Sequence, residues 1–421
     1  MHNNMMGLNR IVSQSYANGI SVVLLMTAIL GPLLAGPMIA GSHLFIFRIL
    51  AIFLLPLLFI IVLKQNSSKI QISGEEILFY IFSIYLIASL SLTQSVSNAL
   101  SSSSVVILPI VTGIIIAASI RGRASLKHLL GVLTILLFIS LLIAMWELAT
   151  GQHLPTSGIS DLPDRFSHNM SAWYYNQNDF SAFVAILSPL LLIKLLHGNR
   201  IQKLLSISAF FIIYIIMYQQ NPRGAILGMI VSTVVCVFIF FFRQPISSVR
   251  NQVSTLLSVA PFIGSLVTVG TVVLVSDTFL LGNQSTLVRW RLFDLSVDIA
   301  GSTIIGVGLG NFQMAVQQSL INTFGIRSPH NWLTWLLAVT GIPGTVLFLL
   351  LLGSLLRQHF INYLENTDPI SLAIIGIVIS FSIAGTGPSN ILHMELIWIL
   401  LGILAASTRI INVKSSGRIS L

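Results

Sequence analysis

Long apolar runs separated by short polar segments recur from one end of the chain to the other. Each run has about the 17–25 residues that cross the hydrocarbon core of a bilayer. The runs are continuous rather than alternating, which predicts helices and excludes the strands of a membrane barrel. They predict twelve membrane-spanning helices, at residues 20–40, 44–63, 76–93, 104–120, 128–148, 178–196, 203–219, 224–242, 256–275, 331–353, 369–386 and 391–408.

Two of the polar segments, residues 149–177 and 276–330, are longer than the others. Long ordered loops often carry function, so 276–330 is the main candidate and 149–177 the second. The small residues Ala35-Gly36-Pro37 would suit a cleaved signal peptide, but the first run is long and the topology favours its retention. Because the chain has no internal repeat and no linker, residues 1–421 are predicted to form one polytopic membrane domain.

The composition excludes a soluble protein. Hydrophobic residues make up 55% of the chain, charged residues make up 8%, and the mean hydropathy is +0.93, whereas soluble domains contain about 25% charged residues. A net charge of +9 would suit nucleic acid, but the basic residues are scattered among short loops, so no nucleic-acid partner is expected. The single cysteine, Cys236, cannot form an intramolecular disulfide.

The basic residues predict the orientation of the chain. With the N-terminus in the cytoplasm, most of the 21 Lys and Arg residues fall in cytoplasmic segments, and every such segment carries at least one. This bias follows the positive-inside rule and predicts that both termini are cytoplasmic. Arg48 lies within the second span. Five arginines lie outside against the rule: Arg165, Arg223, Arg289, Arg291 and Arg327.

Arg223 lies in the tight outer turn 219–224 between two spans. One interpretation is an interfacial arginine whose side chain reaches the membrane surface. The other is an arginine that binds an anion at the depth where lipid phosphates lie. The residues around Arg223 leave both interpretations open.

Arg289 and Arg291 lie in a segment that a helix would place on two different faces. Arg291 would share one face with Asp294 and Asp298, which predicts a structural ion-pair stripe. Arg289 has no acidic residue three or four positions away, so it is the freer candidate for binding a ligand. The two aspartates alone provide too few ligands to predict a metal site.

His330 lies in the segment 327–333, at the outer mouth of the tenth span. A histidine at an interface is often a hydrogen-bonded structural group, but imidazole also exchanges a proton near neutral pH. Because His330 ends the loop that holds Arg289, a role as general base is the sharper hypothesis. His153 and His168, in the other long loop, are expected to be structural.

The glycines from Gly306 to Gly310, followed by Asn311, superficially resemble a nucleotide-binding loop. No strand precedes them and they lie outside the cell, so this interpretation fails. A flexible turn is expected instead.

Six short segments in this order resemble the O-antigen ligase and Wzy-type polymerase family of bacterial envelope glycosyltransferases. The resemblance runs from about residue 147 to 345, whereas the first four spans match only in hydrophobicity. Asn221-Pro222 before Arg223 departs from the small hydroxyl residue that is more usual there. The matching segments are 147–157, Asn176-Gln177-Asn178-Asp179-Phe180, Pro222-Arg223-Gly224, Arg289-Trp290-Arg291-Leu292-Phe293 with Gly306-x-Gly308-x-Gly310-Asn311, Pro329-His330-Asn331, and Gly341-Ile342-Pro343-Gly344.

The resemblance implies an all-α, GT-C-like fold and a reaction at the outer face of the bacterial cytoplasmic membrane, facing the periplasm or the cell exterior. The donor would be a glycan linked to undecaprenyl diphosphate, with neither a metal nor a cofactor. Arg223 and Arg289 would bind the donor diphosphate and His330 would be the catalytic base. Supporting roles would fall to Asn331, Arg291, Asn178 and Asp179.

The first functional hypothesis is a polysaccharide polymerase that joins lipid-linked repeat units. The alternative within the family is a ligase that transfers the finished glycan to a lipid or protein acceptor. The alternative from another class is a lipid-linked oligosaccharide flippase or other transporter. A transporter predicts several charged residues buried within the spans and two related halves of the chain. Arg48 and Glu395 are the two charged residues that the sequence places within the membrane, both near the outer ends of their spans.

Overall fold

The computed structural model describes residues 2–30, 35–39, 42–65, 72–95, 97, 103–161, 168–243, 284–319, 321, 323, 329, 331–388 and 390–416. The described chain is almost entirely helical, as the apolar runs predict. An antiparallel two-stranded ribbon, β1 (Ala35–Ile39) and β2 (Ser42–Phe45), interrupts this pattern. The first predicted span, 20–40, extends too far, because the first helix ends at Ile29 and the ribbon follows it. Gly31-Pro32 and Gly36-Pro37 in this stretch disfavour a helix.

The helices of the described residues follow one another from the N-terminus to the C-terminus. They are α1 (His2–Ile29), α2 (Ile46–Gln65), α3 (Gly74–Ala88), α5 (Leu108–Ser119), α6 (Arg123–Thr150), α7 (Gln177–His197), α8 (Arg200–Gln220), α9 (Arg223–Arg243), α11 (Gln284–Ser302), α12 (Phe312–Gln318), α13 (Trp332–Asn366), α14 (Pro369–Ala384) and α15 (Glu395–Ser416). Short single turns lie between them: η2 (Ser89–Leu92), η3 (Ser103–Ile107), η4 (Gly158–Asp161) and η7 (Ile391–His393).

Eight helices within the described residues are long and apolar enough to cross a membrane: those of α1, α2, α3, α6, α7, α8, α9 and α13. Two shorter apolar helices, Ser104–Ser119 and Pro369–Ala384, lie where the fourth and eleventh spans are predicted. Helix α15 lies at the position of the twelfth. The predicted ninth span, 256–275, falls outside the described residues. The count of twelve spans, the GT-C-like fold and the cytoplasmic termini therefore stay predictions.

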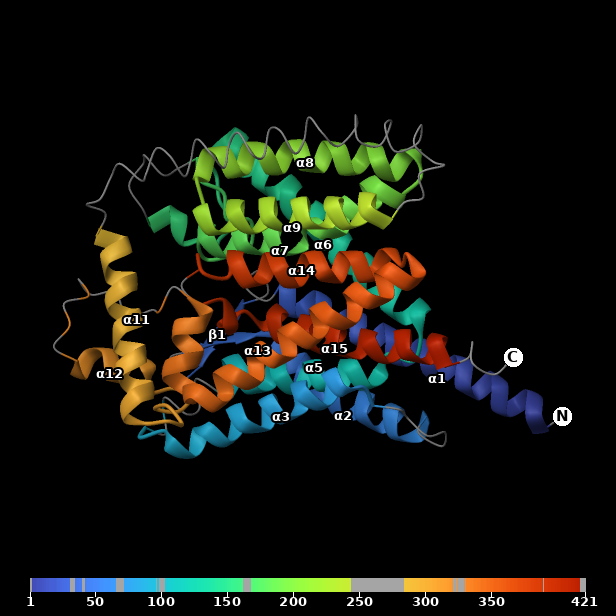
Figure 1. The fold of residues 1–421 in the computed structure, drawn as a ribbon, viewed down its shortest axis with the longest axis horizontal. Helices are drawn as coiled ribbons and strands as arrows, with labels where there is room; N and C mark the ends of the chain where they lie inside the picture. The colour runs from blue at the N-terminus through green and yellow to red at the C-terminus, as the bar shows by residue number, and fades with distance from the viewer. Residues whose placement is uncertain are drawn as a thin grey trace.

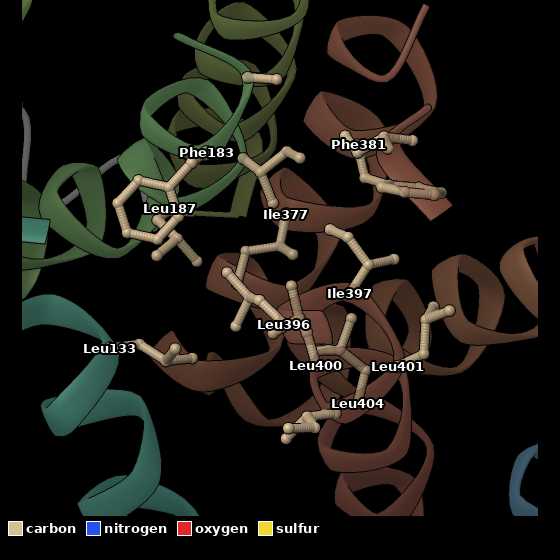
Figure 2. Packing of buried hydrophobic residues seen from close by; sticks show 14 of the residues in the cluster. Leu133, Phe183, Leu187, Ile377, Phe381, Leu396, Ile397, Leu400, Leu401 and Leu404 are labelled. Carbon is tan, nitrogen blue, oxygen red and sulfur yellow. The ribbon is translucent and has the colours of Figure 1, made fainter. Parts of the chain in front are cut away.

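The core forms where α6, α7, α14 and α15 meet. Figure 2 shows Leu133 of α6, Phe183 and Leu187 of α7, and Ile377 and Phe381 of α14 near the apolar side chains of α15. Nearly all of α7 is buried, because α6, α8, α9 and α14 all pack against it. A helix that is apolar all round is one that other helices surround.

Large apolar side chains on the outer helices face away from this core. Phe53 of α2, Ile84 of α3, Phe211 of α8 and Phe242 of α9 are 70%, 66%, 65% and 75% exposed, respectively. In water such a surface would aggregate, so it suits contact with lipid chains.

An ion pair lies near each end of α15. Figure 1 shows the start of α1 and the end of α15 at one end, which we call the termini end, with α11 and α12 at the opposite α11 end. Toward the termini end, Arg409 near the end of α15 pairs with the fully buried Glu76 at 3.2 Å. At the other end of α15, Glu395 pairs with Arg48 of α2 at 3.7 Å. The two charged residues expected within spans therefore pair with each other.

Candidate functional site

The two arginines predicted to bind an anion lie near enough for the charge of one to act on the other. Arg223 begins α9 and is exposed, whereas Arg289 lies in α11 and is half-buried. Burial lowers the pKa of Arg289, and the nearby positive charge of Arg223 lowers it further. An anion lying near both side chains would be stabilised by both positive charges.

Helix α11 orients Arg289 through its buried face. Val288, Leu292 and Ser296 are fully buried at four-residue intervals, and Trp290 on another face is 63% exposed. This spacing turns Arg289 and Arg291 to different sides, as predicted from a helical segment. Helix α11 packs against α13, which carries the next candidate residues.

The predicted ion-pair stripe along α11 is not formed. Asp294 and Asp298 are exposed, and the ion pairs among the described residues do not include one from either carboxylate to Arg291. Three- and four-residue spacings allow such pairs, but water competes for exposed charges and the gain is small. Nor does the described part of the chain contain a group of three or more His, Cys, Asp or Glu side chains placed to hold a metal ion.

The turn that carries Arg223 is held by residues that the sequence did not single out. Gln220, three residues earlier, accepts a hydrogen bond from Ser181 Oγ at 2.7 Å and donates one to the carbonyl of Met170. On the other side, a Cβ at Gly224 would lie 3.3 Å from the Gly387 backbone nitrogen, so the α14–α15 loop packs directly on the turn. These contacts hold the start of α9, and with it the backbone of Arg223, in place.

The loop from α6 to α7 is organised by one buried carboxylate. Glu147 is fully buried, and its Oε2 accepts hydrogen bonds from the Ser171 and Ala172 backbone N–H groups, both at 2.8 Å. Its Oε1 lies 3.2 Å from Nδ1 of His153. His168 Nδ1 lies 3.3 Å from a backbone carbonyl. These contacts agree with the structural roles expected for His153 and His168.

Asn178 and Asp179 lie in the first turn of α7. Asn176 caps this helix: its Oδ1 accepts from the Asp179 N–H at 2.9 Å and its Nδ2 donates to Asp179 Oδ2 at 2.7 Å. Asp179 also lies near the buried Tyr174, whose pKa is raised well above its usual value by burial and, to a lesser degree, by the Asp179 charge. Helix capping thus accounts for Asn176 and Asp179 in the Asn-x-Asn-Asp pattern, and a supporting role of Asn178 and Asp179 in catalysis stays a prediction.

Asn331 caps α13 in the same way. Its Oδ1 accepts a hydrogen bond from the Leu333 N–H at 2.9 Å, so the side chain holds the start of the helix. The preceding residue, the predicted base His330, lies outside the described residues, and so does Arg327. The Asn331 cap fixes the start of α13, while the roles of Arg223, Arg289 and His330 stay predictions.

Helix α13 is broken within its first third. Gly341 has φ 62° and ψ −162°, and Pro343 has no N–H, so the carbonyls of Ala338 and Val339 lose their partners within the helix. We call the segment before the break, Trp332–Thr340, the α13 tip. Val307 N–H donates to Ala338 O at 2.8 Å and Gly308 N–H donates to Val339 O at 3.0 Å. The broken helix is thus completed by another part of the chain, as polar backbone in a membrane protein requires.

The donors of these bonds belong to residues 304–311, which we call the glycine turn. Gly306, Gly308 and Gly310 all have positive φ (77°, 87° and 93°), which agrees with the predicted turn. The expected flexibility is not what the contacts indicate, because Ile342 N–H donates back to Ile304 O at 3.0 Å. The turn is packed into the break of α13.

No known protein-family profile matches the chain. The chain is similar to the teichuronic acid biosynthesis protein TuaE of Bacillus subtilis (strain 168), with 22% identity over 377 residues. The alignment covers 82% of this chain and 73% of that protein.

Proposed function

We propose that the chain is an envelope polysaccharide polymerase of the cytoplasmic membrane, which joins glycan repeat units carried on undecaprenyl diphosphate. The observation that carries this proposal is that the positive charge of Arg223, at the start of α9, reaches Arg289 of α11, next to helices apolar enough to cross a membrane. A lipid diphosphate has the matching parts, because its anionic head needs cations at the membrane surface and its tail needs an apolar scaffold.

In the proposed reaction, an acceptor sugar hydroxyl attacks the anomeric carbon of the donor glycan. The bond from that carbon to the diphosphate oxygen breaks, and the lipid diphosphate leaves with the electron pair. Arg223 and Arg289 stabilise the charge that develops on the leaving oxygen, where little water is present to do so. His330 accepts the proton of the acceptor hydroxyl. His330 gains one positive charge and the departing diphosphate gains one negative charge, so the proposed step uses no metal ion and no nucleotide sugar.

The relative supports the same class of process. TuaE is named for the biosynthesis of teichuronic acid, and the similarity extends over most of both chains. This similarity supports the proposal that the chain takes part in the synthesis of an envelope polysaccharide. The partly buried pair Arg48–Glu395 and the buried pair Glu76–Arg409 join helices near their ends. Packing between helices accounts for both pairs, so neither requires a transport path.

The test uses the purified chain in lipid nanodiscs with an undecaprenyl-diphosphate-linked glycan. The polymerase proposal predicts products that grow by whole repeat units on the lipid carrier. Transfer of the glycan to a separate lipid or protein acceptor without growth would indicate a ligase instead. Movement of the donor across liposome membranes, with no new glycosidic bond, would reject both and indicate a transporter.

A further inference from the structure

The glycine turn and the break in α13 interlock so closely that no side chain fits between them. A Cβ on Gly341 would lie 1.9 Å from the Ile304 carbonyl oxygen, and one on Gly306 would lie 2.6 Å from the Ala338 carbonyl oxygen. Both distances fall well inside van der Waals contact. Together with the backbone hydrogen bonds, this packing makes the α13 tip and the glycine turn one unit.

A third part of the chain closes around this unit. Asn311 Nδ2 donates to Leu92 O at 2.8 Å and to Val307 O at 2.6 Å, and its Oδ1 accepts from Gln94 N–H at 3.3 Å. The Tyr85 hydroxyl of α3 donates to Thr340 O at 2.9 Å, at the end of the tip. We call Tyr85, Gly306, Asn311 and Gly341 the joint.

The joint connects α11 to the α13 tip. Helix α11, which carries Arg289, ends at Ser302 and leads directly into the glycine turn. The α13 tip begins at Trp332, immediately after the segment that holds His330. The arrangement of α11 relative to the tip therefore depends on the contacts of the joint as well as on the packing of α11 against α13.

We propose that Gly306, Asn311 and Gly341 are positioning residues for glycan transfer, which fix the start of α13 at the correct distance from the Arg289 guanidinium. This inference rests on the proposed function. Transfer requires the acceptor oxygen about 3–3.5 Å from the anomeric carbon, and an error of 1 Å costs roughly a hundredfold in rate. The joint would supply that precision without contacting the substrate.

The test compares Gly341→Ala with Gly353→Ala, a matched glycine in the same helix where an added Cβ would meet nothing within 4 Å. Spin labels are attached to cysteines at Asp298 of α11 and Leu337 of the tip, in a Cys236→Ser background. We expect Gly341→Ala to shift or broaden the distance distribution between the labels and to lower turnover by roughly tenfold to a hundredfold. Donor affinity should stay within about threefold, because Arg223 and Arg289 are unchanged. Gly353→Ala should match the parent.

Asn311→Ala is the second variant, since it removes hydrogen bonds without adding a clash and serves if Gly341→Ala does not fold. It should give the same separation of turnover from donor affinity, with a smaller loss. Unchanged label distances and unchanged turnover in a folded Asn311→Ala protein would overturn the proposal. The distance measurement needs no activity, so a parent protein that transfers no glycan would reject the proposed function while leaving the joint testable.

Discussion

At the residue scale, the strongest expectation concerns two arginines of the same helix. Arg289→Ala should abolish glycan transfer at normal expression, because Arg289 is proposed to bind the diphosphate together with Arg223. Arg291→Ala should retain more activity, since α11 turns Arg291 to a different side. Transfer assays on both variants in nanodiscs, normalised to folded protein, check this. If both variants lost all transfer activity, the two arginines would not differ in role, although they lie on different faces of α11.

His330 is the residue on which the proposed chemistry depends most. His330→Ala should lower turnover by roughly two to four orders of magnitude, the usual contribution of a positioned base, while donor binding changes little. Activity of the parent should fall at low pH as the imidazole takes up a proton. Asn331→Ala is the comparison: it removes the cap of α13 but no proton acceptor, so a smaller loss is expected. Near-normal turnover of His330→Ala would make the histidine structural.

At the element scale, the sequence predicted the helices well, because a bilayer leaves a backbone few other ways to satisfy its hydrogen bonds. The break in α13 was not predicted, although Gly341 and Pro343 mark its position. A glycine and a proline permit a break, but the partners of the freed carbonyls are the N–H groups of Val307 and Gly308, which the local sequence does not reveal. The ion-pair stripe on α11 was predicted but is not formed, for the converse reason that spacing alone does not make exposed charges pair.

The loop between α6 and α7 gives a prediction at the element scale. Glu147→Ala would leave the buried Ser171 and Ala172 N–H groups without their acceptor, at a cost of about 1–3 kcal/mol for each. Glu147→Gln keeps an acceptor oxygen and should lose less. Thermal unfolding of both variants, with the exposed Thr150→Ala as control, measures the difference. An unfolding temperature for Glu147→Ala equal to that of the control would contradict the central role of this carboxylate.

At the scale of the whole molecule, the prediction is the topology. Cysteines at Arg223, Arg289 and His330, in the Cys236→Ser background, should react with a membrane-impermeant reagent applied outside the cell. Cysteines at Arg123 and Arg200 should react only after the membrane is opened. Figure 1 is consistent with this division, because the start of α1 and the end of α15 lie at the end opposite α11. Labelling of position 123 from outside would overturn the count of twelve spans.

The central claim is that Arg223 and Arg289 bind one diphosphate together. The most direct measurement is a double-mutant cycle on the dissociation constant of undecaprenyl-diphosphate glycan, using Arg223→Ala, Arg289→Ala and both together. Arg357→Ala, an exposed arginine at the other end of α13, is the control. Each single change is expected to weaken binding about tenfold or more, and the double variant should lose less than the two effects combined. Fully additive losses, or donor binding as tight as in the Arg357→Ala control, would contradict the claim.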